Sequence, residues 1–207
     1  MAQFFQIHPA NPQPRLVKGA VDIVRAGGVI AYPTDSSYAL GCHIGDKEAM
    51  ERIRRLRRVG DDHNFTLVCR DLSEVAQYAR VGNADYRLLR ANTPGPYTFI
   101  LPATREVPRR LQHPKRKTIG LRIPEHVIAQ ALLAELNEPL MSSTLILPGD
   151  DLPLSDPEEI RSRLEHDVEL VIDGGFCGLD ATTVVELEDG IPKLLRQGKG
   201  DSSWFST

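Results

Sequence analysis

The sequence VIAYPTDSSYALG, residues 29–41, places a run of polar side chains between two apolar runs. The first run, residues 29–32, is short, rich in β-formers and preceded by two glycines, which predicts a buried strand. Pro33 and one aspartate suffice to turn the chain after a strand, yet Thr-Asp-Ser-Ser follows at 34–37 before Tyr38 resumes the apolar pattern. Ligands of open α/β sheets gather at strand ends, so this polar segment is a candidate binding site.

The 207-residue chain has the composition of one globular domain, with 41% hydrophobic and 26% charged residues. No apolar run is long enough to span a bilayer, and the N-terminal segment lacks the basic start and apolar core of a signal peptide. Cys42, Cys69 and Cys177 are far apart and never in C-x-x-C spacing, which predicts reduced thiols. Together these features predict a cytoplasmic protein with no membrane partner.

A net charge of −3 hides two basic stretches. Five arginines fall in residues 52–58 and seven basic residues in 105–122, whereas residues 150–189 hold 13 acidic and only two basic side chains. The basic stretches predict a positively charged face that attracts nucleic acid. The residues predicted to contact RNA are Arg52, Arg55, Arg58, Arg109, Arg110, Lys115 and Arg116. The alternative is that these side chains are solvated and pair with Asp and Glu.

The spacing of apolar residues predicts helices mixed with strands. Helices are expected at about 11–25, 47–58, 72–80, 83–91, 124–136 and 156–166, and strands at 29–33, 64–69, 97–101, 118–124, 139–147, 168–172, 182–187 and 192–196. Asn11, Asp46 and Asp71 are the predicted N-caps of three helices. Because strands and helices do not alternate strictly, we expect one α/β domain at 1–200 around a twisted mixed sheet, and a loose tail at 201–207.

Common sequence signatures of catalysis and cofactor binding are missing from the chain. It has no G-x-x-x-x-G-K-[ST] loop, no G-x-G-x-x-G after a strand, no H-E-x-x-H and no G-x-S-x-G. Its six histidines are dispersed, which argues against a metal site, and His63 in the turn DDHNF is interpreted as a solvated surface residue. The sequence therefore predicts chemistry without a side-chain nucleophile, a bound metal or a dinucleotide.

Polar residues also occur at the ends of, or within, the other predicted strands. Each has a structural explanation, since Thr favours strands and Ser and Asp favour turns. Several together, with cations beside two of them, favour a shared ligand site instead. The residues are Thr34, Asp35, Ser36, Thr98, Lys117, Thr118, Arg122, Ser142, Ser143, Thr144, Thr182 and Thr183.

Seven segments follow one another in the order and spacing of a known family. They are GGVIAYPTDSSYALGC, NFTLVCRDLSE, PGPYTFIL, KTIGLRIPEH, PLMSST, ATTVVEL and LLRQG, and with their flanks they cover about residues 13–200. By these motifs the chain resembles the YrdC/YciO family, the relatives of threonylcarbamoyl-adenylate synthase, and most of all its YciO branch. The resemblance implies a single YrdC/RibB-like α/β domain, whose twisted mixed sheet is flanked by helices and has a concave basic surface linked with double-stranded RNA.

The synthases of that family join threonine, bicarbonate and ATP into threonylcarbamoyl-AMP and pyrophosphate, a step in tRNA modification. A carbamate oxygen attacks the α-phosphate, so the protein mainly positions reactants and neutralises charge. The resemblance implies ATP or AMP and threonine or threonylcarbamoyl-adenylate as partners, no tightly bound cofactor, and Mg²⁺ arriving with ATP if the protein is catalytic. It assigns substrate or nucleotide binding to Thr34, Asp35, Ser36, Tyr38, Thr98, Thr118, Ser142, Thr144, Thr182, Thr183 and Arg196, and catalysis to Arg57, Lys117 and Arg122.

Two motifs depart from the synthase pattern. The K-x-R pair of the synthases corresponds here to Arg57 and Val59, and their S-x-N motif to Thr144 and Ile146. The side chains of Val59 and Ile146 form no hydrogen bonds, and removing one polar interaction at a reacting centre costs about 2–4 kcal/mol. The resemblance therefore implies weak or altered synthesis.

Two classes of function follow from the sequence. The first is an enzyme of the threonylcarbamoyl-adenylate type, acting as a synthase, as an adenylate hydrolase or in transfer to another acceptor. The alternative is a non-catalytic double-stranded RNA-binding protein acting on tRNA or rRNA, which needs only a positive, shaped surface. Aromatic residues make up 6% of the chain, which disfavours binding of single strands by base stacking.

Overall fold

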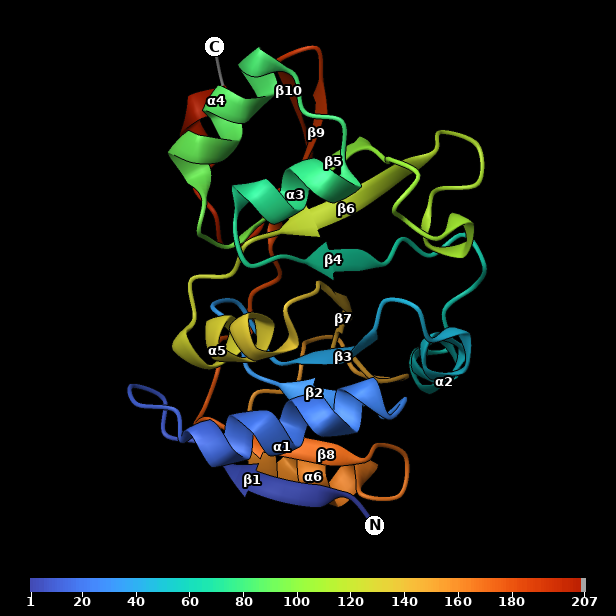
Figure 1. Ribbon diagram of the computed structural model, residues 1–207, viewed down its shortest axis with the longest axis vertical. Helices are drawn as coiled ribbons and strands as arrows, with labels where there is room; N and C mark the ends of the chain where they lie inside the picture. The colour runs from blue at the N-terminus through green and yellow to red at the C-terminus, as the bar shows by residue number, and fades with distance from the viewer. Residues whose placement is uncertain (206–207) are drawn as a thin grey trace.

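The computed structural model describes residues 1–205, which form one α/β domain on a single ten-stranded sheet (Figure 1). The strand order is β1-β8-β2-β3-β7-β4-β6-β5-β9-β10, with parallel and antiparallel pairs mixed. The strands are β1 (Gln3–Gln6), β2 (Ile30–Tyr32), β3 (Ala39–His43), β4 (Thr66–Val68), β5 (Tyr97–Pro102), β6 (Thr118–Arg122), β7 (Leu140–Thr144), β8 (Leu170–Asp173), β9 (Thr183–Glu188) and β10 (Ile191–Arg196). The predicted fold class is confirmed.

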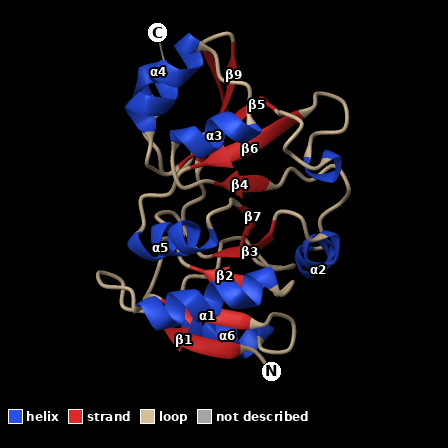
Figure 2. Cartoon of the chain, viewed as in Figure 1, coloured by secondary structure: helices blue, strands red, loops and turns tan. Residues whose placement is uncertain are grey.

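Helices flank this sheet (Figure 2). They are α1 (Pro14–Arg25), α2 (Lys47–Arg57), α3 (Leu72–Tyr78), α4 (Asn83–Asn92), α5 (Val127–Leu136) and α6 (Pro157–Leu164), with short 3-10 turns η1 (Arg109–Leu111) and η2 (Ser203–Phe205). The predicted caps Asp46 and Asp71 are confirmed, because each side chain accepts the backbone N–H three residues on. The predicted cap Asn11 is wrong: α1 begins at Pro14 after Gln13, since proline lacks the N–H that a first helical position leaves unpaired.

The stretch at 29–41 is a hairpin of β2 and β3. Ile30 lies opposite Gly41, and Tyr32 lies opposite Ala39, so the polar segment 34–37 belongs to the connection between the two strands. The sequence does not predict β3, because its residues ALGCH are almost all buried and therefore do not alternate between polar and apolar. The hairpin places its polar connection beside the strands of the candidate site.

Side chains that alternate between the two faces of the sheet build two apolar layers. On one face, Ile30 and Tyr32 pack with α1 and α5, which lie side by side in Figure 1. On the other face, Leu40, Leu67 and Leu121 join a cluster with residues of α2, α4 and α6. The central strands are thus buried on both sides, and the candidate site lies farther along the face that carries α1 and α5.

The two ends of the described chain differ from the sequence prediction. β1 is an unpredicted edge strand that pairs in parallel with β8, and it was missed because only Phe4 and Phe5 are apolar in its four residues. The tail predicted to be loose contains η2, where the Trp204 ring lies 6.2 Å from that of Tyr97. Residues 206–207 of that predicted tail lie outside the described residues.

The cysteines are free thiols, as predicted. Burial raises the pKa of Cys42 to about 12 and that of Cys177 to about 11, so both remain protonated at neutral pH and are poor nucleophiles. Each helix in the part of the chain that the structure describes is too short or too polar to span a bilayer.

Candidate functional site

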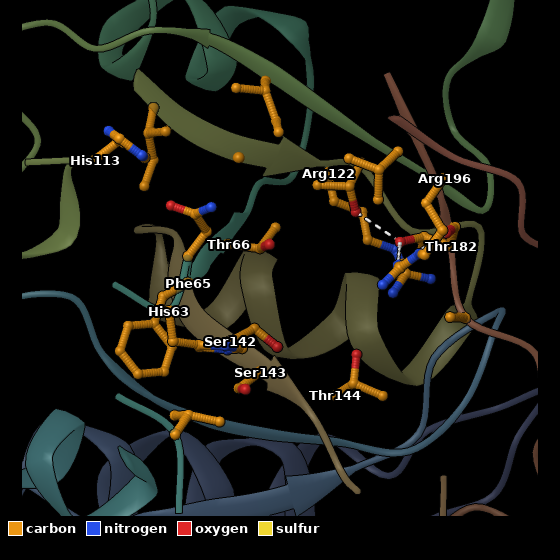
Figure 3. Close-up of a pocket in the computed structure, with 18 of the residues that line it drawn as sticks. His63, Phe65, Thr66, His113, Arg122, Ser142, Ser143, Thr144, Thr182 and Arg196 are labelled. Atoms are coloured by element: carbon orange, nitrogen blue, oxygen red, sulfur yellow. Dashed lines mark hydrogen bonds between the residues drawn. The ribbon is translucent and has the colours of Figure 1, made fainter. Parts of the chain in front are cut away.

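A cavity of about 780 Å³ lies on the sheet face that carries α1 and α5 (Figure 3). It forms because the neighbouring strands β7, β4, β6, β5 and β9 present alternate residues to one side. The register places Thr66 opposite Ser142 on one side and Gly120 on the other. The floor consists of Ser142, Thr144, Thr66, Val68, Thr118, Gly120, Arg122, Thr98, Ile100, Thr182, Val184 and Glu186. Its volume is that of a small-molecule pocket.

Hydroxyl groups dominate this floor. The hydroxyl oxygens of Thr98 and Thr182 lie 2.8 Å apart, and that of Ser142 lies 2.7 Å from the buried Tyr32 hydroxyl. Gly120 has no side chain that could project into the cavity at the middle of the floor. A Cβ at this position would come within 3.2 Å of the Thr98 side chain. The floor can therefore donate and accept hydrogen bonds along its length, as an amino acid or a ribose requires.

Arg57, the last residue of α2, stands at one end of the cavity. Its Nε donates to the Ile146 carbonyl at 3.3 Å, and its Nη1 donates to Ser143 Oγ at 2.6 Å and to His63 Nε2 at 3.1 Å. Burial lowers the pKa of Arg57, yet a guanidinium stays charged at neutral pH. Among residues 1–205 no carboxylate pairs with it, so its charge is available to an anion.

Arg196, at the end of β10, is the second of the cavity-lining arginines without an acidic partner among residues 1–205. Its Nε and Nη2 donate to the Thr182 carbonyl at 3.1 and 2.9 Å, and Nη2 also reaches Thr182 Oγ1 at 3.2 Å. Burial lowers its pKa as well. Figure 3 shows Arg196 and Arg122 on the side of the cavity opposite His63, so the two unneutralised guanidinium groups mark its two ends.

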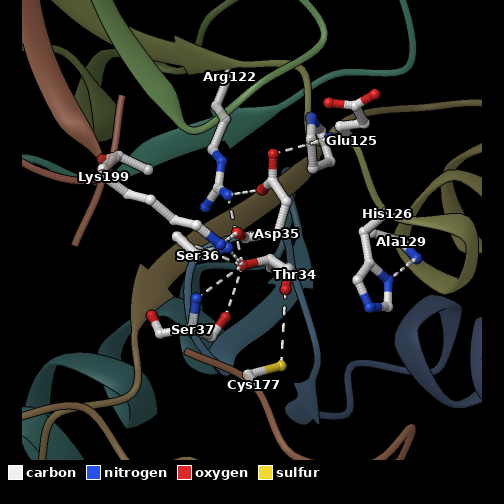
Figure 4. Close-up of polar contacts among 12 residues, drawn as sticks. Thr34, Asp35, Ser36, Ser37, Arg122, Glu125, His126, Ala129, Cys177 and Lys199 are labelled. Atoms are coloured by element: carbon white, nitrogen blue, oxygen red, sulfur yellow. Dashed lines mark hydrogen bonds and ion pairs between the residues drawn. The ribbon is translucent and has the colours of Figure 1, made fainter. Parts of the chain in front are cut away.

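Arg122 is held by a buried ion pair with Asp35 (Figure 4). The two side chains are 9% and 11% exposed, and the second carboxylate oxygen of Asp35 accepts the N–H of Glu125 at 2.9 Å. Lys199 Nζ donates to the backbone carbonyl of Asp35 at 2.5 Å. The Nε of Arg122 is buried without a hydrogen-bond partner in residues 1–205, so this donor of the guanidinium is available to a ligand.

The polar segment of the hairpin supports Arg122 from behind the cavity. Thr34 Oγ1 donates to the Ser37 carbonyl at 2.6 Å and lies 3.2 Å from Ser36 Oγ, so these groups shape the turn. The Tyr38 hydroxyl donates to the Gly175 carbonyl at 2.7 Å. Of this segment, only Ser37 lines the cavity. The predicted residues are not part of the lining; they are Thr34, Asp35, Ser36 and Tyr38.

Two further predicted residues lie outside the cavity lining. Lys117 is exposed at a left-handed turn with φ of 57°, and its neighbour Arg116 lines the cavity instead. Thr183 is fully buried and donates to the Gly200 carbonyl at 2.7 Å, because its place in β9 faces the opposite side from Thr182. The predicted residues that do line the cavity are Arg57, Thr98, Thr118, Arg122, Ser142, Thr144, Thr182 and Arg196.

His63 is a lining residue that the sequence interpretation missed. Its ring lies edge-on to Phe65 at 5.1 Å between centroids, and its Nε2 faces Arg57. Burial, with the positive charges of Arg57 and Arg54, lowers the pKa of His63 to about 4. The prediction of a solvated surface histidine is wrong; Phe65 two residues later, which faces the core, was the signal that this turn folds inward.

The two positions that depart from the synthase motifs also meet here. Val59 and Ile146 both line the cavity near Arg57, and the Ile146 carbonyl takes a hydrogen bond from that arginine. The acidic lining residues are Asp62 and Glu186, the latter 3.1 Å from Arg116. Within residues 1–205, no group of three or more His, Cys, Asp or Glu side chains is arranged to hold a metal ion.

The residues predicted to contact RNA divide into two sets. Arg52 pairs with Glu169 at 2.7 Å and Arg116 pairs with Glu186, as expected from the alternative of solvated, paired side chains. Arg110 donates to the Ile44 carbonyl at 3.2 Å. The exposed members without an ion pair to any described residue are Arg55, Arg58, Arg109, Arg110 and Lys115.

Comparisons with known proteins agree with this geometry. The family model for Sua5, YciO and YrdC proteins, described as telomere recombination, matches residues 22–198. The uncharacterized protein YciO of Escherichia coli K12 is 60% identical over 99% of this chain and 100% of its own length. The crystal structure of E. coli YciO, at the same identity and coverage, matches with a TM-score of 0.95. The resemblance inferred from the seven sequence segments is confirmed.

More distant relatives include proteins named for a reaction or a ligand. A threonylcarbamoyl-AMP synthase of Halorhodospira halophila is 28% identical over 86% of this chain and 92% of its own. The crystal structure of P. abyssi Sua5 complexed with L-threonine has the same fold, with a TM-score of 0.86 at 24% identity over 94% of this chain and 57% of that chain.

We expect acid to destabilise the protein through His63. Its folded-state pKa of about 4 lies below the ordinary value of 6.5, so the unfolded chain binds the extra proton between these values and stability falls as pH drops through this window. His63→Gln removes that proton uptake, and the variant should lose less stability than the wild type between pH 6.5 and 4, by about 1–2 kcal/mol after allowance for solvent screening. Urea melts at both pH values measure the difference. His166→Gln, whose side chain is 72% exposed, is the control, and equal losses in all three proteins contradict the prediction.

Proposed function

This chain belongs to the Sua5, YciO and YrdC family, and from that premise we propose that its cavity binds an acyl adenylate of the threonylcarbamoyl-AMP class, or the threonine and adenine nucleotide from which it forms. The observation that carries the proposal is the pair of unneutralised guanidinium groups, Arg57 and Arg196, at opposite ends of a hydroxyl-rich floor. Such an adenylate has a carboxylate at its amino-acid end and a phosphate within it. The amino-acid hydroxyl lies on one side of the phosphate and the ribose hydroxyls lie on the other. Guanidinium groups suit both anions.

The reaction class follows from what the cavity offers. Attack of a carbamate oxygen on a phosphate, and its reversal or hydrolysis, needs positioning and charge neutralisation and no side-chain nucleophile. Arg122 is pre-aimed by Asp35, and the floor hydroxyls orient the substrate. Mg²⁺, where needed, arrives with the nucleotide. The names of two relatives, a threonylcarbamoyl-AMP synthase and a Sua5 protein complexed with L-threonine, support the same class and a role in tRNA modification.

Synthesis itself is expected to be weak. Val59 and Ile146 present apolar side chains to one end of the cavity. Arg57 lies at the same end and has no acidic partner among the described residues. Two polar contacts that the synthase motifs supply are absent there, and each is worth about 2–4 kcal/mol at a reacting centre. The pocket therefore suits hydrolysis or transfer of the adenylate at least as well as its formation.

Calorimetry with AMP and with threonine tests the pocket. We expect Arg196→Ala to weaken AMP binding at least tenfold, because it removes a cation that no acid of residues 1–205 neutralises. Arg122→Lys keeps the charge beside Asp35 but loses the planar fork, and should weaken binding to a lesser degree. Arg87→Ala, an exposed arginine of α4, is the matched control. AMP binding that ignores both Arg196 and Arg122 contradicts this assignment of the pocket.

Restoring the two missing groups tests the proposed reason for weak synthesis. We expect Val59→Arg with Ile146→Asn to raise pyrophosphate release from ATP, threonine and bicarbonate at least tenfold, which needs only about 1.4 kcal/mol of transition-state stabilisation. Val59→Arg also adds a second guanidinium beside Arg57. Thermal melts of parent and variant control for the cost of placing a polar side chain at the half-buried Ile146. A variant that folds and binds both substrates, yet reacts no faster than the parent, refutes the explanation.

Duplex RNA binding is the second candidate function, and one surface feature favours it. Figure 1 shows α2 and the loop between β5 and β6 on the same side of the molecule, and Arg110 of this loop donates to the carbonyl of Ile44, in the connection that leads into α2. Arg55, Arg58, Arg109 and Lys115 are exposed on these two segments without an ion pair in the described chain. We propose this surface for contact with the backbone of tRNA or rRNA.

The dependence of RNA affinity on salt tests that surface. Each phosphate neutralised by a cation releases counterion, so affinity should fall linearly on a log–log plot against salt. Replacing Arg109, Arg110, Lys115 and Arg116 together with Ala should flatten the slope by roughly 0.7–0.9 for each phosphate that the variant no longer neutralises. Arg161→Ala with Arg163→Ala, from the acidic part of the chain, is the control. An unchanged slope identifies the basic residues as solvated surface.

A further inference from the structure

The guanidinium of Arg57 is almost fully occupied before any ligand arrives. It has five N–H donors: one on Nε and two on each terminal nitrogen. The Nε donor goes to the Ile146 carbonyl, and the two Nη1 donors go to Ser143 Oγ and His63 Nε2. Only the two hydrogens of Nη2 have no partner in residues 1–205.

This distribution excludes a two-pronged contact with an anion. A carboxylate or phosphate binds arginine bidentately either through Nε and Nη2 or through Nη1 and Nη2. The Ile146 carbonyl occupies the first edge, and the two Nη1 acceptors, Ser143 Oγ and His63 Nε2, together occupy the second. Arg57 can therefore offer an incoming anion one nitrogen, which is a weaker and less directional contact than the paired fork.

His63 is fixed as a neutral acceptor. Arginine only donates, so the hydrogen bond at 3.1 Å requires that His63 Nε2 accept and that its proton sit on Nδ1. The edge-on contact with Phe65 holds the ring in place, and the low pKa of about 4 keeps it uncharged at neutral pH. His63 thus takes up donor capacity of Arg57 without adding positive charge.

The charge of the whole cavity is also small. Four arginines line it, and three carboxylates offset them: Asp62 and Glu186 in the lining, and Asp35 paired with Arg122 behind it. Lys199, which donates to the Asp35 carbonyl, adds one further positive charge behind the lining. This small excess of positive charge suits a monophosphate better than uncomplexed ATP, which carries more negative charge than AMP. Mg²⁺ offsets part of that charge, so for the Mg²⁺ complex the discrimination depends on the donors that Arg57 can offer.

Building on the proposed function, we propose that His63 determines the class of nucleotide: with the Ile146 carbonyl it limits Arg57 to a single-nitrogen contact, and the pocket binds nucleoside monophosphates and acyl adenylates in preference to triphosphates. The physiological substrate is then an adenylate formed elsewhere, which this pocket hydrolyses: a water oxygen bonds to phosphorus, the carbamoyl O–P bond breaks, and AMP and the amino-acid carbamate are released. His63 acts through Arg57 and is a specificity-determining, positioning residue.

The test is the ratio of the dissociation constants for ATP and AMP, measured by calorimetry with and without excess Mg²⁺. The wild type should bind AMP at least tenfold more tightly than ATP. His63→Ala frees a donor of Arg57 Nη1 and should bring the ratio close to one by strengthening ATP binding. His63→Gln keeps an acceptor and should keep the wild-type preference, and so should the remote control His166→Ala. His63→Leu, which fills the same space without an acceptor, replaces the alanine variant if that does not fold.

The binding results distinguish the nucleotide preference, the role of His63 and the proposed function. A wild type that binds ATP as tightly as AMP overturns the inference and leaves the proposed function standing. A preference for AMP that survives both His63→Ala and His63→Leu assigns the selectivity to other groups and overturns the role of His63. Failure of every variant and of the wild type to bind any of the nucleotides defeats the proposed function and the inference with it.

Discussion

The candidate site depends on one buried ion pair, Arg122 with Asp35. Arg122 is the last residue of a central strand and is only 8% exposed, so its permanent charge must be compensated within the protein. Asp35 compensates it from the connection between β2 and β3, and this carboxylate is itself fixed by the Glu125 N–H. This requirement explains the polar run in an otherwise apolar stretch: Thr34 and Ser36 shape the turn that aims Asp35, and Arg122 reaches the cavity with its orientation already set.

The arginines at the two ends of the cavity have different hydrogen-bond and ion-pair partners. At one end Arg122 is neutralised by a carboxylate while Arg196 is satisfied by the Thr182 carbonyl and hydroxyl. At the other end Arg57 has only neutral acceptors, among them His63. Neutral acceptors lower the cost of burying a cation without cancelling its charge. Both Arg57 and Arg196 therefore still attract anions. The two differ in the number of N–H donors that remain free for a ligand.

The sequence predicts those parts of the site that alternation and motif spacing define. Thr98, Ser142 and Thr182 are on the cavity floor as expected, because strand residues two apart share a face and the strand order brings them together. Thr183 could not be separated from Thr182 without knowing which face of β9 is open. His63 was missed for a different reason: its burial comes from the fold of a turn against Arg57 and Phe65, contacts that no periodic pattern encodes.

The departures from the synthase motifs acquire a common explanation at Arg57. A guanidinium with no partners in an empty pocket would be costly, and here the Ile146 carbonyl, Ser143 and His63 remove that cost. The same bonds reduce what a ligand can gain, because a phosphate that seeks the paired fork must first displace one of them. Ile146 offers Arg57 only its backbone carbonyl, and this carbonyl competes with the ligand for Nε. Compensation of the buried guanidinium and affinity for a highly charged phosphate are opposed at this residue, because acceptors of the protein take three of the five N–H donors of Arg57.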